Sequence, residues 1–261
     1  MKIIKRHLGG SFTLLMAISI FLVNCGGGND NPTSRPPQPP PASTKQSPAK
    51  TGGATISGKV NFTGTPPRQR TINFGAELQC AKLHPGKVKN DRVVINENNT
   101  LMWTLVHIVG VVGENFDPPT EQITMDQVGC IFTPHAAAVM VGQPVEFRNS
   151  DPVLHNVRGT VEKGKSFNVA KQKGENYIHT FKSSQIGIPV KCDVHPWMLG
   201  VVHVLPHPFF AITDENGSFK IENVPPGSYK VEAWHERLGT QQLEVTIQAG
   251  ETKNIDLTFA G

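Results

Sequence analysis

The chain has almost no surplus of charge once its first 24 residues are set aside. The formal net charge of the 261 residues is +4 at pH 7. Three of the 25 basic residues (Lys2, Lys5 and Arg6) stand in residues 1–24, which hold no acidic residue, so 22 basic and 21 acidic residues remain. Proteins that bind nucleic acid carry a basic surface that neutralises phosphates. We therefore expect no nucleic-acid partner.

The N-terminal apolar run is too short to span a bilayer comfortably. It extends from Phe12 to Val23 after a basic start, which is the pattern of an export signal. The run ends at Leu22-Val23-Asn24-Cys25, which resembles a lipoprotein signal peptide although Asn24 replaces the usual small residue. The resemblance implies that residues 1–24 are removed and that lipid on Cys25 anchors an exported protein to a membrane. A plain secretory signal or an uncleaved anchor is the alternative.

Large apolar residues are almost absent from residues 25–53, which are rich in Pro, Gly, Ser and Thr. Such a segment cannot bury a core, so we expect a disordered, Pro-rich tether.

Beyond the tether, segments rich in Val, Ile and Thr alternate with Gly and Pro turns, which predicts an all-β chain. Residues 160–174 are interpreted as a polar loop between strands. The strands that we expect are at 55–62, 92–95, 101–112, 177–181, 186–192, 199–205, 228–234, 243–247 and 255–259.

The stretch with the clearest chemistry is Cys192-Asp193-Val194-His195-Pro196-Trp197-Met198. A thiolate, an imidazole and a thioether at this spacing are the ligands that a mononuclear blue-copper centre takes from one loop. The fourth ligand would be His155, at the end of a predicted strand and loop. The amide of the neighbouring Asn156 is well placed to brace the ligand loop.

The residues around these ligands are similar to cupredoxins. Residues 122–157 run through Phe-x-Pro and two alternating strands to His155, and the short Cys-x2-His-x2-Met loop looks like that of amicyanin-type cupredoxins. The resemblance implies a Greek-key β-sandwich over residues 119–206, one type 1 copper ion, and an electron port at the exposed edge of His195 beside Pro196 and Trp197. It also implies a monomer that meets redox proteins transiently. A fragment of a multicopper oxidase or nitrite reductase is disfavoured, because the chain has no His-x-His motif.

The C-terminal part has a different character. Asp214-x-x-Gly217-x-Phe219-x-Ile221, followed by Val-Pro-Pro-Gly-x-Tyr-x-Val, resembles the second half of a carboxypeptidase regulatory-like domain, a small transthyretin-like β-sandwich. The opening strand of that domain type occurs far upstream, at residues 56–60. We therefore expect residues 54–118 and 207–261 to form one sandwich into which the cupredoxin is inserted, with residues 56–62 paired to strands beyond residue 210.

Only four cysteines are present. With Cys25 assigned to lipid and Cys192 to copper, Cys80 and Cys130 remain, and in an exported protein they most simply form a disulfide. The alternative is a second metal site, because His84 and His135 each follow one of these cysteines closely.

Catalysis is not expected. Four ligands leave no open position on the copper, and the sequence at His235-Glu236 lacks the second histidine of a zinc-protease helix. The sequence thus predicts a carrier of single electrons. The alternatives are a protein that stores or delivers copper, and an interaction module in which copper is incidental.

Overall fold

A computed structural model describes residues 53–75, 77–111 and 115–261 of the chain. The predicted signal peptide (residues 1–24), the lipid attachment at Cys25 and all but the last residue of the predicted tether lie outside the described residues. Among the described residues, no helix has the length and apolar character that a membrane span requires.

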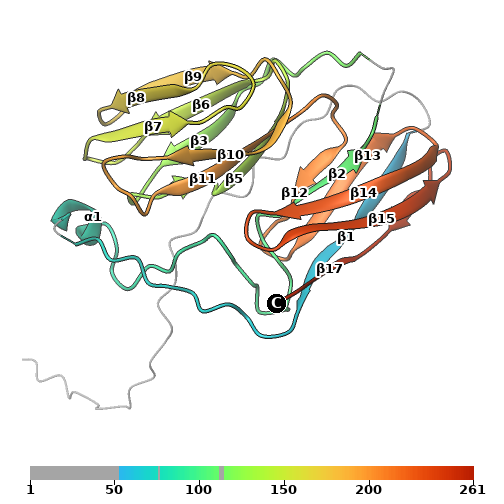
Figure 1. Cartoon of the computed structure of the whole chain (residues 1–261), viewed down its shortest axis with the longest axis horizontal. Helices are drawn as coiled ribbons and strands as arrows, with labels where there is room; N and C mark the ends of the chain where they lie inside the picture. The colour runs from blue at the N-terminus through green and yellow to red at the C-terminus, as the bar shows by residue number, and fades with distance from the viewer. Residues whose placement is uncertain (1–52, 76, 112–114) are drawn as a thin grey trace, which may run out of the picture. The chain divides into compact units, whose positions relative to one another are not determined.

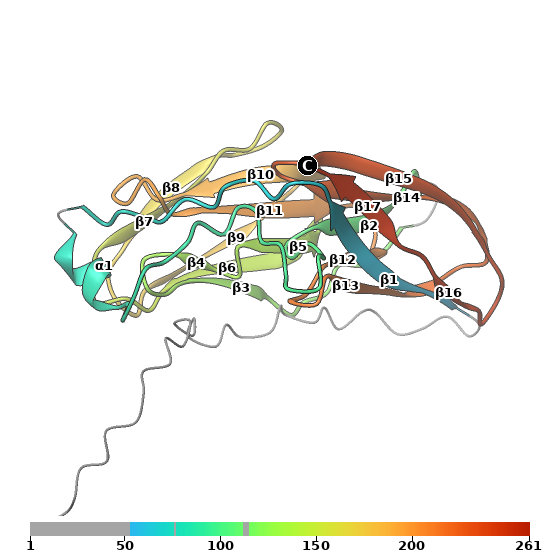
Figure 2. The ribbon, with the colours of Figure 1, turned by 90° about the horizontal axis from the view of Figure 1, so that it is seen from below.

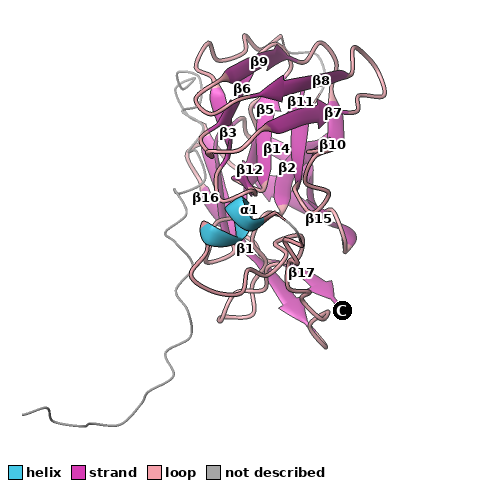
Figure 3. Ribbon diagram, turned by 90° about the vertical axis from the view of Figure 1, so that its left-hand side faces the viewer, coloured by secondary structure: helices cyan, strands magenta, loops and turns pink. Residues whose placement is uncertain are grey.

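The prediction of an all-β chain is confirmed. The described residues form strands β1 to β17 and one short helix, α1 (Leu78–Lys82), and the strands are arranged in four sheets (Figure 1). Figure 3 shows α1 as a helix among strands and loops.

In the first sandwich, the N-terminal strand β1 (Ala54–Thr63) lies between strands from the other end of the chain (Figure 2). It pairs antiparallel with β13 (Ser218–Val224) and parallel with β16 (Thr252–Asn254) and β17 (Leu257–Ala260). The second sheet has the order β12 (Phe210–Ile212), β2 (Leu105–Val109), β14 (Gly227–His235) and β15 (Gly239–Ile247). Both sheets therefore combine strands from before and after residues 119–206, as a sandwich built from two segments requires.

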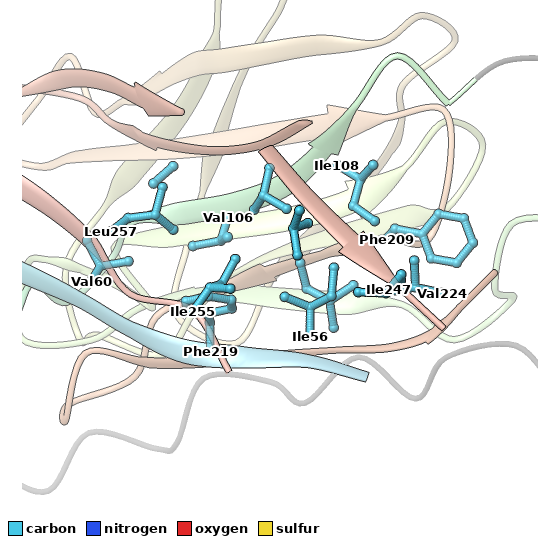
Figure 4. Packing of buried hydrophobic residues seen from close by; sticks show 14 of the residues in the cluster. Ile56, Val60, Val106, Ile108, Phe209, Phe219, Val224, Ile247, Ile255 and Leu257 are labelled. Carbon is cyan, nitrogen blue, oxygen red and sulfur yellow. The ribbon is translucent and has the colours of Figure 1, made fainter. Parts of the chain in front are cut away.

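Alternating apolar residues of these sheets meet in one core. Ile56 and Val60 of β1 point toward Val106 and Ile108 of β2, and Phe219 closes the same core (Figure 4). Since side chains of a strand alternate between its two faces, this spacing directs one face of each strand inward.

The second sandwich lies between β2 and β12 in the sequence. One sheet has the order β5 (Ala136–Met140), β11 (Leu199–Leu205), β10 (Gln185–Lys191), β7 (His155–Gly159) and β8 (Phe167–Lys171). The other has the order β4 (Phe132–Thr133), β3 (Ile123–Gln127), β6 (Pro144–Asn149) and β9 (Asn176–Thr180). Phe132, Phe147 and Val202 belong to its core.

Three local expectations were wrong. The predicted strand at 92–95 is a loop, in which only Ile95 forms a bridge, with Leu101. The strand predicted from residue 101 begins only at Leu105, because Trp103 has a positive φ of 63° that interrupts an extended backbone. Residues 160–174 are not a loop throughout, since they contain β8, which pairs with β7.

A group of charged side chains around the buried His135 connects the two sandwiches. His135, just before β5, lies 3.2 Å from an oxygen of Asp91 and forms a second ion pair with Glu236, which follows β14. Arg92 in turn lies 2.7 Å from Glu236. Burial alone would lower the pKa of His135, but the carboxylates of Asp91 and Glu236 outweigh it and raise the pKa to about 9. His135, which the sequence left ambiguous, is thus a charged link between the sandwiches.

We expect His135→Ala to lower the free energy of unfolding by about 3 kcal/mol, because it leaves two carboxylates without their buried partner. The His135 contribution should be complete below pH 6.5 and should disappear as the pH rises through about 9, since folding raises the pKa. Denaturant unfolding at pH 6 and pH 10 tests this. If the free energy of unfolding changed by the same amount between pH 6 and pH 10 in wild type and in His135→Ala, the prediction would be contradicted.

Candidate metal centre

The loop between β10 and β11 is closed by its own backbone. The N–H of Cys192 donates to the carbonyl of Met198 (3.2 Å), and the N–H of Met198 donates to the carbonyl of His195 (2.9 Å). β10 and β11 pair antiparallel up to Lys191 and Leu199, so Cys192 and Met198 are held side by side where the strands end. Both side chains are buried in the core of the second sandwich.

Three predicted ligands converge on one point. His155, the first residue of β7, faces His195 with 2.8 Å between the two Nδ1 atoms. The Sγ atom of Cys192 lies 3.9 Å from Nδ1 of His155 and 3.8 Å from Nδ1 of His195. All three side chains are buried. The fold therefore brings together residues that are up to 40 positions apart in the sequence. Two imidazole nitrogens and one sulfur then surround a common centre.

Asp151 fixes the orientation of His155. Its Oδ2 atom lies 2.9 Å from Nε2 of His155, and a carboxylate can only accept, so Nε2 carries the proton. The lone pair of the neutral ring is then on Nδ1, toward His195 and Cys192. Asp151 is itself buried and accepts from the backbone N–H groups of Gly129 and Cys130 (2.7 Å each).

Asp151 is the functional residue that sequence reasoning missed. It stands four residues before His155, a spacing that could have suggested it as the partner of this ring. Hydrogen bonds from carboxylates to metal-binding histidines are common in metal sites, where they set the tautomer.

Asn156 contacts the ligand loop through its side-chain oxygen. Oδ1 accepts from the backbone N–H of Asp193 (2.6 Å) and from the thiol of Cys192 (3.3 Å), while Nδ2 donates to Oδ2 of Asp193 (3.0 Å). Burial alone would raise the pKa of the Cys192 thiol, but hydrogen bonds with His155, Asn156 and His195 together outweigh it and lower the pKa below 9.0. The surroundings of Cys192 thus favour the thiolate, the form that binds metals.

The donor set suits one metal ion. Bonds of about 2.0–2.3 Å to nitrogen and sulfur are typical for zinc with these donors, and the three separations are short enough for one ion to contact all three atoms. The 2.8 Å between the two Nδ1 atoms is a hydrogen-bond distance, so without a metal ion one ring donates to the other, and a metal ion would take the place of that proton. Two His and one Cys, with a Met beside them, is the ligand set of blue-copper sites.

The prediction that one edge of the His195 ring is exposed is wrong. Only 1 % of this residue is exposed, although Pro196 is exposed and Trp197 partly so. The covering residues come from a segment that we call the cap (residues 68–90, with Ala76 outside the described residues), which contains α1. Figures 1 and 2 both draw α1 beside the end of the second sandwich where β10 and β11 are joined.

The cap packs directly on His195. Sγ of Cys80, in α1, lies 3.6 Å from Nε2 of His195. Phe74 stacks on His84 and meets Trp197 edge-on, with ring centroids 5.2 and 5.4 Å apart. The side chain of His84 also contacts the carbonyl of Gly129 at 2.7 Å. Although the cap follows β1 in the sequence, it therefore packs on the second sandwich.

A disulfide joins Cys80 of the cap to Cys130, so neither cysteine offers a thiolate for a second metal site. Cys130 is also the residue whose carbonyl accepts from the indole N–H of Trp197 at 3.0 Å. Among the described residues, Cys192 is the free cysteine.

Comparison with known proteins gives partial likenesses. Residues 202–260 match the carboxypeptidase regulatory-like domain, and no curated protein matched the chain. A copper-containing nitrite reductase from Thermus scotoductus is 27 % identical over 37 % of this chain, with a TM-score of 0.31, and the match spans 25 % of the reductase. A purple cupredoxin from Nitrosopumilus maritimus is 27 % identical (32 % of this chain, 97 % of that chain, TM-score 0.28). A reduced amicyanin mutant is 21 % identical over 38 % of this chain and 97 % of that chain, with a TM-score of 0.29.

We expect Asp151→Asn to weaken copper binding about 10- to 100-fold, because the neutral amide no longer fixes the ring of His155 as strongly. Competition with a chelator of known affinity measures this. Asp126→Asn, a carboxylate of β3 that accepts from Ser150, is the matched control and should leave the affinity unchanged. Equal affinities of wild type and Asp151→Asn would show that this hydrogen bond is dispensable.

We expect the double variant Cys80→Ser, Cys130→Ser to lose about 2–4 kcal/mol of stability, because the disulfide closes a loop of about 50 residues. Its cap should also detach more often and expose His195. Modification of His195 by diethyl pyrocarbonate, followed by mass spectrometry of the metal-free protein, should be faster than in wild type. An unchanged rate would mean that packing alone holds the cap.

Proposed function

We propose that this protein is an exported lipoprotein, tethered to a membrane through Cys25, that carries single electrons through one type 1 copper centre. His155, Cys192, His195 and Met198 would be the copper ligands. The observation that carries the proposal is the convergence of the two Nδ1 atoms and the Cys192 Sγ atom within 3.9 Å of one another.

The bound copper would supply a reversible one-electron couple. Trigonal coordination by two imidazoles and a thiolate with a weak thioether suits both oxidation states, and the protein would hold that geometry through both. Asp151 holds the ring of His155, and Asn156 holds the backbone of the ligand loop. Because Asp151 and Asn156 are both buried, little of the site should rearrange when the charge on the metal changes.

Burial of the ligands favours electron transfer over delivery of copper. His155, Cys192, His195 and Met198 are all buried, and the cap covers His195. Handover of a metal ion requires an acceptor ligand to reach it, whereas an electron can cross a covering layer of protein. The four ligands also leave no position for a substrate, so we propose no catalysis at this site.

The copper(II)-loaded wild type should show an intense thiolate-to-copper absorption band in the visible range. Cys192→Ser should abolish the band, because it removes the thiolate that gives rise to it. The double variant Cys80→Ser, Cys130→Ser is the matched control and should keep the band, since these sulfurs are joined in a disulfide. A colourless copper adduct of the wild type would refute the proposal, and a band that survives in Cys192→Ser would refute the ligand assignment.

A further inference from the structure

The cap lies between the ring of His195 and any partner protein that approaches the ring from the side of Nε2. Nε2 of His195 lies 3.6 Å from Sγ of Cys80 and 3.9 Å from a carboxylate oxygen of Glu77, and both residues belong to the cap. The two ends of the cap lie side by side, because Thr71 and Lys89 form a β-bridge and the N–H of Asn90 donates to the carbonyl of Arg70. A protein that docks over His195 therefore contacts the cap first.

The cap differs in charge from the rest of the folded chain. Residues 68–90 hold five basic residues and one acidic residue, Glu77, whereas the rest of residues 54–261 holds 14 basic and 19 acidic residues. All six charged residues of the cap are exposed: Arg68, Arg70, Glu77, Lys82, Lys87 and Lys89. An acidic protein is thus attracted to the cap and repelled by the remaining surface, which would orient it as it arrives.

The cap also presents apolar side chains to solvent. Leu78 of α1 is 66 % exposed and Leu83, directly after α1, is 37 % exposed. The two leucines flank Cys80 in the sequence, so the exposed apolar groups stand within three residues of the sulfur that contacts His195. Apolar side chains among charged ones are typical of the surfaces at which proteins associate.

Resting on the function proposed above, we propose that the cap is the docking surface for a redox protein whose contact face is acidic around an apolar patch. One electron passes between the redox group of that partner and the metal centre by way of Cys80 and His195. No bond forms or breaks in this step, no proton moves, and the disulfide stays intact. A route through α1 crosses a single non-bonded gap of 3.6 Å before it reaches the ligand ring.

Two c-type cytochromes, one acidic and one basic, serve as probes of the whole protein. We expect the reduced acidic cytochrome to reduce the copper(II) protein faster than the basic one at low ionic strength, with the difference fading as salt is added. The triple variant Lys82→Glu, Lys87→Glu, Lys89→Glu should slow the acidic cytochrome at least about ten-fold at low ionic strength. Leu78→Asp should slow it as well and should keep the slower rate at high salt.

A matched control changes the net charge equally on the first sandwich. Lys59→Glu, Lys220→Glu, Lys230→Glu alters three exposed lysines that are not in the cap, and it should slow the acidic cytochrome clearly less than the cap variant does, since the force between charges falls with their separation. A binding measurement that needs no copper accompanies the kinetics. Addition of the acidic cytochrome to the metal-free protein should shift the backbone amide signals of Leu78–Lys82.

Two results would overturn the docking surface. One is an equal loss of rate in the cap variant and the control variant. The other is a set of amide shifts confined to the copper loop around Val194 and Pro196, without shifts in α1. Failure of the proposed function is seen separately: the wild type then lacks the visible band and reacts with neither cytochrome, while the amide shifts of the metal-free protein still report whether the cap binds.

Discussion

The hydrogen bond between Asp151 and His155 is the interaction on which the candidate site depends. It places the proton on Nε2 and leaves Nδ1 to face the other donors. The same carboxylate accepts from Gly129 and Cys130, and Cys130 is the anchor of the cap. The buried carboxylate of Asp151 thus contacts both a candidate ligand and the residue that anchors the cap. The hydrogen-bond donors around Asp151 stabilise its buried charge.

The cap and the buried charges around His135 join the two sandwiches in different ways. The cap leaves the first sandwich after β1, covers His195, and is fixed by a disulfide to the loop before β4. The group of His135, Asp91 and Glu236 joins the sandwiches through ion pairs. A copper domain held in this way would present its ligands to a partner through a surface contributed by the other segment of the chain.

Local patterns in the sequence predicted most of the strands and the residues that meet at the site. The alternation of apolar residues in β1, and the spacing of Cys192, His195 and Met198, are short-range signals that do not depend on distant contacts. The pairing of β1 with β13 is the arrangement required by a sandwich in two segments, and the domain boundaries stay a prediction. The cap was missed for a physical reason: which loop covers His195 depends on packing between residues more than 100 positions apart. Asp151 was missed although it stands only four residues before His155, because the spacing alone does not show which way either side chain points.

The central claim is that one ion is held by His155, His195 and Cys192 together. X-ray absorption at the copper edge of the loaded protein tests it most directly, because it reports the elements bound to the metal whatever the electron-transfer rate. We predict a first shell of two imidazole nitrogens and one short bond to sulfur, with the sulfur lost in Cys192→Ser and two nitrogens retained. A shell made only of nitrogen and oxygen in the wild type would contradict the account.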